Sequence, residues 1–303
     1  MAFGLDWDRD GPQWPLHETS RFVEAAGLRW HVQVYGEGPP ALLVHGTAAS
    51  AHTWRGLGPI LAQRWRIIAP DLPGHGFTQA PPRALQTLPG TGQAVAELLA
   101  ALGESPQWAV GHSSGAALLA RMALDGHIAP QAIVGLNAAF FPFSGVAGHI
   151  FPTTARLLTY NPLVPFWLAF RARNRAFLAD VLARTGSRLD DAGIDLYQRL
   201  GTSPAHVAAA LGMMARSHDD LYRLVEDLPS LDLPLVLLAA TNDRTVPPQQ
   251  AQRARSRVPH ARIEPLEGLG HLAHEEDPEG VARRMLAVLD EGAPKGRGPV
   301  IVR

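Results

Sequence analysis

The pentapeptide GHSSG at 111–115 places Ser113 between two glycines. It follows a short apolar run at 108–110 and precedes an apolar stretch typical of a helix. A tight turn from strand to helix can present a nucleophilic serine above a sheet, because small neighbours leave room for the strained backbone. The N-terminus of the helix would also stabilise developing negative charge. A chance match is the competing interpretation, and Ser114 is the other hydroxyl in the motif.

A serine hydroxyl needs a base, and in this kind of site the chain order is serine, acid, histidine. Asp243 follows an apolar run at 233–239, and His271 lies in a glycine-rich loop after a second run at 261–265. We therefore expect Ser113, Asp243 and His271 to form a catalytic triad that hydrolyses an ester or a related acyl bond. A turn-forming aspartate and an ordinary loop histidine are the alternatives.

Two backbone N–H groups are expected to stabilise the oxyanion of such a reaction. One belongs to Ser114, directly after the nucleophile. The other belongs to Thr47, because Gly46 permits the turn that would aim this N–H inward. Asp71 comes too early in the chain to be the catalytic acid, so we expect it to brace neighbouring loops through hydrogen bonds.

His274 follows His271 by three residues, a spacing that suggests a metal site. No third ligand has a recognisable spacing, so neither a metal nor another cofactor is expected. Glu275 and Asp277 are expected at the start of the following helix, where acidic side chains oppose the helix dipole.

Short apolar runs and helix-like stretches alternate along most of the chain. The predicted strands are 28–34, as a half-buried edge strand, then 41–44, 66–69, 108–110, 132–136, 233–239 and 261–265. The predicted helices are 91–102, 116–124, 249–258 and 278–289. This alternation predicts a parallel, doubly wound α/β sheet whose C-terminal strand ends bring the site loops together. Residues 1–25 are expected to form an irregular arm.

Composition excludes several other classes of protein. The 303 residues are 46% apolar and include no cysteine, so disulfides and thiolate catalysis are excluded. The net charge of −1 provides no general attraction for nucleic acid. The N-terminus has no features of a signal peptide, and no apolar run approaches the roughly 20 residues that span a bilayer. A cytoplasmic protein is expected, with peripheral membrane contact left open.

Five sequence marks, taken together, resemble the α/β-hydrolase superfamily over about residues 26–290. The marks are HGT at 45–47, DLPGHG at 71–76, GHSSG at 111–115, Asp243 with VP at 246–247, and GH at 270–271. The resemblance implies a mostly parallel, eight-stranded sheet with a helical lid. The α/β-hydrolase core would comprise 1–137 and 231–303, and the cap would comprise 138–230.

A narrower resemblance is to the magnesium-chelatase accessory hydrolases of bacteriochlorophyll biosynthesis. It rests on LDWDRDG at 5–11, GLRWHVQ at 27–33, LLARM at 118–122, NPLVP at 161–165 and GLGHLAHEE at 268–276. It implies a role in photosynthetic pigment synthesis near magnesium insertion, with magnesium chelatase as a partner. The substrate would be a small apolar acyl compound or a porphyrin.

The aromatic, apolar cap would suit a flat hydrophobic ligand, although the same side chains could simply pack the cap on the sheet. The residues expected to contact the substrate are His45, His112, Phe140, Phe143, Phe166 and Trp167. Arg171, Arg173 and Arg175 could meet propionate groups or form a solvated helix face.

Two other functions remain open from the sequence. A cofactor-free perhydrolase or haloperoxidase-like enzyme would need the same triad. A tetrapyrrole-binding accessory protein could retain the triad without using it, although a pure binder has no need of strained catalytic geometry. Enzymes of this fold that open halides or epoxides usually have aspartate at the nucleophile position. This chain has Ser113 there, so we do not expect that activity.

Overall fold

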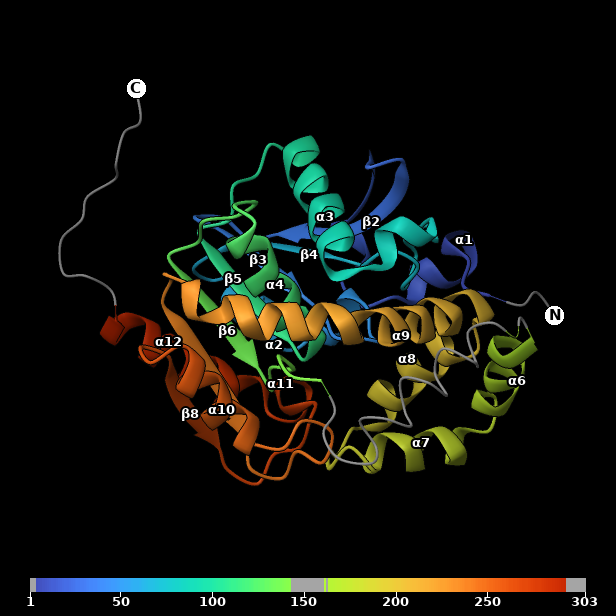
Figure 1. The fold of residues 1–303 in the computed structure, drawn as a ribbon. Helices are drawn as coiled ribbons and strands as arrows, with labels where there is room; N and C mark the ends of the chain where they lie inside the picture. The colour runs from blue at the N-terminus through green and yellow to red at the C-terminus, as the bar shows by residue number, and fades with distance from the viewer. Residues whose placement is uncertain (1–3, 143–160, 162, 293–303) are drawn as a thin grey trace.

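The computed structural model describes residues 4–142, 161 and 163–292, and its centre is a mixed sheet (Figure 1). The described strands are β1 (Ser20–Ala25), β2 (Leu28–Tyr35), β3 (Pro40–Val44), β4 (Arg66–Pro70), β5 (Trp108–His112), β6 (Ala132–Leu136), β7 (Leu235–Ala240) and β8 (Arg262–Leu266). They lie in the order β1-β2-β4-β3-β5-β6-β7-β8. β2 is antiparallel to both of its neighbours, and the other pairs are parallel. The predicted fold class is thereby confirmed.

Helices cover both faces of this sheet. The described α-helices are α1 (Trp7–Asp10), α2 (Leu57–Leu61), α3 (Leu88–Leu102), α4 (Ser114–Leu124), α6 (Leu163–Ala172), α7 (Arg175–Ala183), α8 (Asp191–Gly201), α9 (Pro204–Asp227), α10 (Gln249–Arg257), α11 (Ala273–Glu276) and α12 (Pro278–Gly292). Short 3-10 helices are η1 (Gly11–Gln13), η2 (His17–Thr19), η3 (Ala51–Trp54), η4 (Arg83–Gln86) and η5 (Leu228–Ser230). Within the described part of the chain, no helix has the length and apolarity needed to cross a bilayer.

Alternate side chains of the central strands enter two separate apolar cores. Leu42 and Val44 of β3 pack in the core that includes α3, α4 and α10. Ala41 and Leu43 enter the core on the opposite face, with α2 and α12. Burial on both faces explains why these strands are continuous apolar runs in the sequence.

The parallel register brings the strand ends to one edge of the sheet. His112 of β5 pairs with Leu136 of β6, and Leu136 is level with Leu238 of β7. Ala240 pairs with Leu266 of β8. The residues that follow β5, β6, β7 and β8 therefore lie close together, as expected for a site at the carboxyl ends of parallel strands.

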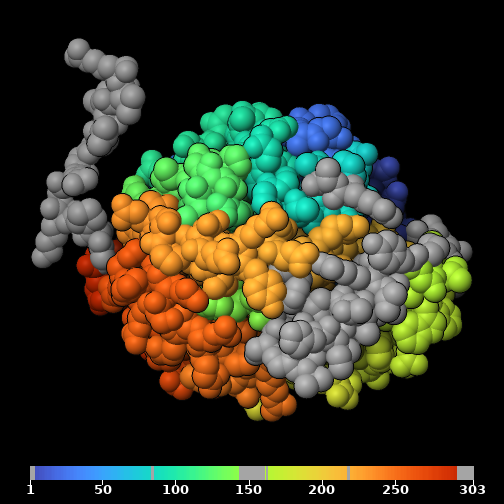
Figure 2. All heavy atoms as spheres, viewed as in Figure 1, coloured from blue at the N-terminus to red at the C-terminus, as the bar shows by residue number. Residues whose placement is uncertain are grey.

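The described helices α6 to α9 lie between β6 and β7, within the range expected to interrupt the alternation. Figures 1 and 2 show α9 running across the front of the molecule. This long helix contacts α3 and α4 of the core as well as α6 and α8. It therefore links the inserted helices, here called the insertion (163–230), to the sheet.

The N-terminal segment corrects the expectation of an irregular arm. Residues 20–25 form the outermost strand β1, so β2 is an inner strand and is mostly buried, rather than a half-buried edge. Trp14 is 2% exposed and packs with Tyr197 and Leu200 of α8. Helix α3 also begins before residue 91, because the Thr87 hydroxyl accepts the N–H of Gly90 and caps the first turn.

Candidate active site

Ser113 occupies a strained turn between β5 and α4. Its φ of 51° and ψ of −118° are unusual for a residue with a side chain. A Cβ on Gly111 would collide with the start of α4, and one on Gly115 would collide with the backbone of Val44 and His45. These contacts explain the two glycines of the pentapeptide, and the strained turn matches the backbone expected of a nucleophile elbow.

His271 and Asp243 are joined by a short hydrogen bond at the same sheet edge. The distance from His271 Nδ1 to Asp243 Oδ2 is 2.7 Å. Asp243 Oδ1 accepts the N–H groups of Thr245 at 2.7 Å and Val246 at 2.8 Å, which fixes the carboxylate. Because Asp243 needs a donor from His271, Nδ1 carries the proton and Nε2 is left as the basic nitrogen.

The residue before Ser113, rather than Ser113 itself, contacts this pair. The ring of the adjacent His112 lies 4.7 Å from that of His271, measured between centroids. Among the described residues, the Ser113 hydroxyl makes no hydrogen bond to His271. Such contacts are often loose without substrate.

Two side chains, at the end of β5 and just after β6, donate hydrogen bonds to the histidine loop. The carbonyl oxygen of His271 accepts from His112 Nε2 at 2.9 Å and from Asn137 Nδ2 at 2.8 Å. Asn137 Oδ1 in turn accepts the N–H of Ala240 at 2.8 Å. Burial, together with His274 and His271, lowers the pKa of His112 well below its usual value, so this ring is neutral. The His112 side chain therefore holds the backbone of His271. This structural role corrects the expectation that His112 contacts the substrate.

The segment 185–188 of the insertion contacts both the acid loop and the histidine loop. Asn242 Nδ2 donates to the carbonyl of Gly186 at 2.8 Å. The N–H of Arg244 donates to the carbonyl of Thr185 at 3.0 Å. The Ser187 hydroxyl accepts the N–H of the residue after His271 at 2.8 Å. The insertion thus takes part in positioning His271 and Asp243, which the sequence analysis did not detect.

The two expected oxyanion donors lie next to each other. The N–H of Thr47 donates to Ser114 Oγ at 2.9 Å, and the two hydroxyl oxygens are also 2.9 Å apart. Thr47 Oγ1 lies 3.3 Å from the sulfur of Met213 on α9. Ser114 is the first residue of α4, where a backbone N–H lacks a partner within the helix. The structure thus brings both backbone groups to the elbow, with the Thr47 N–H occupied by a hydroxyl.

His45 is fully buried, which corrects its expected contact with substrate. Its Nδ1 donates to the carbonyl of Gly46 at 2.8 Å, and its Nε2 accepts the N–H of Leu72 at 2.9 Å. Burial lowers the pKa of His45, which agrees with a neutral ring that uses both nitrogens. The side chain therefore fixes the shape of the loop that carries Thr47.

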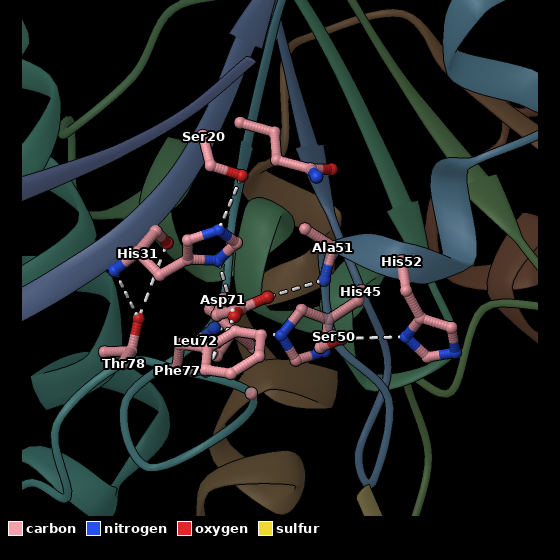
Figure 3. Close-up of polar contacts among 12 residues, drawn as sticks. Ser20, His31, His45, Ser50, Ala51, His52, Asp71, Leu72, Phe77 and Thr78 are labelled. Carbon is pink, nitrogen blue, oxygen red and sulfur yellow. Dashed lines mark hydrogen bonds and ion pairs between the residues drawn. The ribbon is translucent and has the colours of Figure 1, made fainter. Parts of the chain in front are cut away.

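Asp71 braces three segments, as predicted, and also ends a hydrogen-bonded serine–histidine–aspartate chain (Figure 3). His31 Nδ1 lies 2.8 Å from Asp71 Oδ2, and His31 Nε2 lies 2.9 Å from Ser20 Oγ. Asp71 also accepts the N–H groups of Ala51 at 2.7 Å and Phe77 at 2.9 Å. Burial raises the pKa of Asp71, but His31 and Ala51 outweigh it and bring this pKa to about 2.

The aromatic residues expected to bind substrate differ in their position and exposure. Phe140 is 1% exposed and belongs to the core beneath α4. Phe166 and Trp167 are 53% and 60% exposed on α6, so they line no enclosed pocket in this structure. Phe143 lies outside the described residues.

Glu275 also differs from the expectation, because it is buried in α11 rather than at the start of the next helix. It forms an ion pair with Arg55 and accepts the hydroxyls of Thr53 at 2.5 Å and Tyr197 at 2.8 Å. Tyr197 belongs to α8, so this cluster joins the insertion to the core. Asp277 is at the start of α12, as predicted, where its Oδ1 accepts the N–H of Gly280 at 2.9 Å.

The fold and the loops at this sheet edge are those of an α/β hydrolase, and the chain belongs to the alpha/beta hydrolase family, which matches residues 41–284. It is 35% identical over 279 residues to the magnesium-chelatase 30 kDa subunit of Rhodobacter capsulatus, covering 91% of this chain and 96% of that protein.

More distant relatives include named hydrolases. The chain is 26% identical over 273 residues to the 2-hydroxy-6-oxo-2,4-heptadienoate hydrolase of Pseudomonas putida, covering 88% of this chain and 94% of that enzyme. The solved structure of Cfl2 from Burkholderia cenocepacia has the same fold. Its TM-score is 0.73 at 23% identity, with 89% of this chain and 95% of that chain covered.

Proposed function

We propose that this protein is a serine hydrolase that cleaves an ester or related acyl bond of an apolar substrate. The observation that carries the proposal is the 2.7 Å bond from His271 Nδ1 to Asp243 Oδ2 beside a serine in a strained elbow. This bond leaves His271 Nε2 as a base, and the elbow presents a hydroxyl to it. The elbow distinguishes this arrangement from the His31–Asp71 pair, whose serine, Ser20, has an extended backbone in β1.

In this mechanism, Ser113 Oγ attacks the acyl carbon while His271 Nε2 takes its proton. Asp243 keeps the proton on Nδ1 and stabilises the imidazolium that forms. Collapse of the tetrahedral intermediate breaks the acyl bond, and His271 gives its proton to the leaving oxygen. Water then enters, loses a proton to His271 and releases the acid from the acyl-enzyme, which restores the Ser113 hydroxyl.

The oxyanion would be stabilised by the N–H groups of Ser114 and Thr47. The Ser114 hydroxyl, which now accepts the Thr47 N–H, would turn away as the oxyanion takes its place. The helical insertion would act as a lid that limits access of water, since its segment 185–188 contacts the loops of Asp243 and His271.

The biological substrate is proposed to belong to bacteriochlorophyll or magnesium-porphyrin synthesis. Similarity to a protein named as a magnesium-chelatase subunit supports this assignment. The same similarity favours one further function, that of a tetrapyrrole-binding partner of the chelatase. The two functions can be distinguished by experiment, because hydrolysis requires an activated serine and tetrapyrrole binding does not.

Labelling with a fluorophosphonate probe tests the proposal directly. The wild type should be labelled, Ser113→Ala should not be labelled, and His271→Gln should lose most of the labelling while remaining folded. Esters of porphyrins and of simple acids would then define the substrate. Absence of labelling in the folded wild type, together with saturable porphyrin binding, would instead support the accessory binding protein.

A further inference from the structure

Four large apolar side chains are exposed along one side of α6. They are Leu163 (70% exposed), Phe166 (53%), Trp167 (60%) and Phe170 (60%). Their spacing of three and four residues places them on one helix face. Pro165, Ala169 and Ala172 occupy the buried side of the same helix. The four exposed residues are called the α6 stripe below.

This concentration is unusual within the described part of the chain. Six large hydrophobic side chains are exposed there, and the α6 stripe contains four of them; the others are Val181 and Tyr222. Single exposed apolar residues need no explanation, but a contiguous group marks an interaction surface. The α6 stripe therefore needs an occupant of defined chemistry.

The charge around the α6 stripe indicates an anionic occupant. Arg171 and Arg173 lie at the C-terminal end of α6. The next two arginines along the chain are ion-paired, Arg175 with Asp191 and Asp195 and Arg184 with Asp180. The Arg171 guanidinium lies 5.9 Å from the centre of the Trp167 ring, and that of Arg173 lies 6.0 Å from Phe170. Two arginine side chains therefore lie next to aromatic side chains of the α6 stripe.

We propose that the α6 stripe docks on the surface of an anionic lipid bilayer. Tryptophan and phenylalanine would enter the boundary between headgroups and acyl chains, while the adjacent arginines reach lipid phosphates. In Figure 2 the yellow-green surface of α6 and α7 lies at the edge of the molecule. A protein partner would more often be bound by a larger surface than one helix face.

Vesicle sedimentation of the full chain tests this proposal. Wild type should bind vesicles of phosphatidylcholine with a third of phosphatidylglycerol, bind pure phosphatidylcholine much less, and lose binding as salt rises. The variant Phe166→Ser with Trp167→Ser should bind at least about tenfold more weakly, since two large apolar side chains no longer leave water. Tyr222→Ser, which changes an exposed aromatic residue on α9, should bind as the wild type does.

A charge variant provides the second arm of the experiment. Arg171→Glu with Arg173→Glu should also lose binding to the anionic vesicles. Arg255→Glu with Arg257→Glu, an equal charge change on the exposed side of α10, should lose far less. Both pairs change exposed side chains, so circular dichroism should show unchanged folding.

Three outcomes would overturn the proposal. They are no binding by wild type, equal binding by the α6 variants and their controls, or a dimer in sedimentation velocity that depends on the α6 stripe without any vesicle binding. Ser113→Ala should still bind vesicles, so failure of docking and failure of the proposed hydrolysis can be distinguished.

Discussion

The backbone N–H of Thr47 donates to the hydroxyl oxygen of Ser114 over 2.9 Å. Thr47 lies in the loop after β3, and Ser114 is the first residue of α4. The backbone N–H groups of these two residues are the expected oxyanion donors. One of the two donors is therefore occupied by a side chain in this state. An oxyanion that binds there competes with the Ser114 hydroxyl, so this side chain should influence the rate of attack on Ser113.

Ser114→Ala should increase the rate of fluorophosphonate labelling. The substitution removes the competing acceptor and keeps both backbone N–H groups. A neutral hydrogen bond contributes about 0.5–1.5 kcal/mol, so an increase of roughly two- to tenfold is expected. The measurement is the second-order labelling rate of wild type and variant at one pH.

Thr47→Val is the matched control, because it removes the Thr47 hydroxyl and leaves its N–H in place. It should change the rate less than Ser114→Ala does. A fall of tenfold or more in Ser114→Ala would contradict the expectation and would mean that the hydroxyl itself donates to the oxyanion.

Ser187→Ala should lower ester turnover with little change in KM. Ser187 is 4% exposed, and its hydroxyl accepts the N–H of Leu272, directly after His271. Without that acceptor, a buried N–H is left unpaired at a cost of about 1–3 kcal/mol, and the histidine loop loses a fixed point. Kinetics on a small ester and a urea melt would measure both effects.

Ser256→Ala is the control for this substitution. The Ser256 hydroxyl is exposed and donates only to the carbonyl of Arg253 in its own helix. Both kinetics and stability should stay near those of the wild type. If Ser187→Ala lost stability but kept its turnover, the segment 185–188 would be structural without positioning His271.

The nucleophile elbow, the acid loop and the histidine loop were predictable because each follows a recognisable strand in the chain. The central strands follow from the same pattern, whereas their order in the sheet came from the structure. Asn137 and Ser187 were not predictable, because their partners in the histidine loop lie more than 80 residues further along the chain. A polar side chain in a loop gives no sign of which distant backbone group it will meet.

Strand β1 was missed for a related reason. Its sequence alternates weakly, and it has partners on one side only, so little of it is buried. His45 and His112 were expected to contact the substrate. Their hydrogen bonds instead hold loops. The sequence does not show whether a histidine ring faces a loop or the substrate.

Ser20→Ala should retain full labelling by the fluorophosphonate probe. Ser20 forms the same kind of chain with His31 and Asp71 that Ser113 is proposed to use. However, its backbone is extended, with a φ of −73°, and it lies within a strand rather than at an elbow. Residual labelling of Ser113→Ala that disappears in the double variant would show that Ser20 is reactive.

Asp71→Ala should destabilise the protein by about 3 kcal/mol or more, because it leaves His31 and two backbone N–H groups without their buried acceptor. The free energy of unfolding in urea measures this loss. Asp290→Ala, which removes an exposed partner of Arg64, is the control and should cost less than about 1 kcal/mol. Equal losses in the two variants would contradict the bracing role of Asp71.

Buried neutral histidines should make the fold sensitive to mild acid. Burial lowers the pKa of His206 to about 4 and that of His274 to about 3, and it also lowers the pKa of His45, His52, His75 and His112. The unfolded chain takes up these protons near pH 6.5, so it binds more protons than the folded chain below that pH. Stability should be complete above about pH 6.5 and fall toward pH 4.

His206→Gln tests this sign at a single position. The His206 ring donates to the carbonyl of Ala48 and accepts the N–H of Gly76, and a glutamine amide can serve both groups. Between about pH 6.5 and pH 5, wild type should lose roughly 1.5 kcal/mol more than the variant, the contribution of this one group. Urea midpoints across that range measure the difference, with His260→Gln, at an exposed position, as the control. Parallel pH profiles for wild type and His206→Gln would show that His206 is not the source of the acid sensitivity.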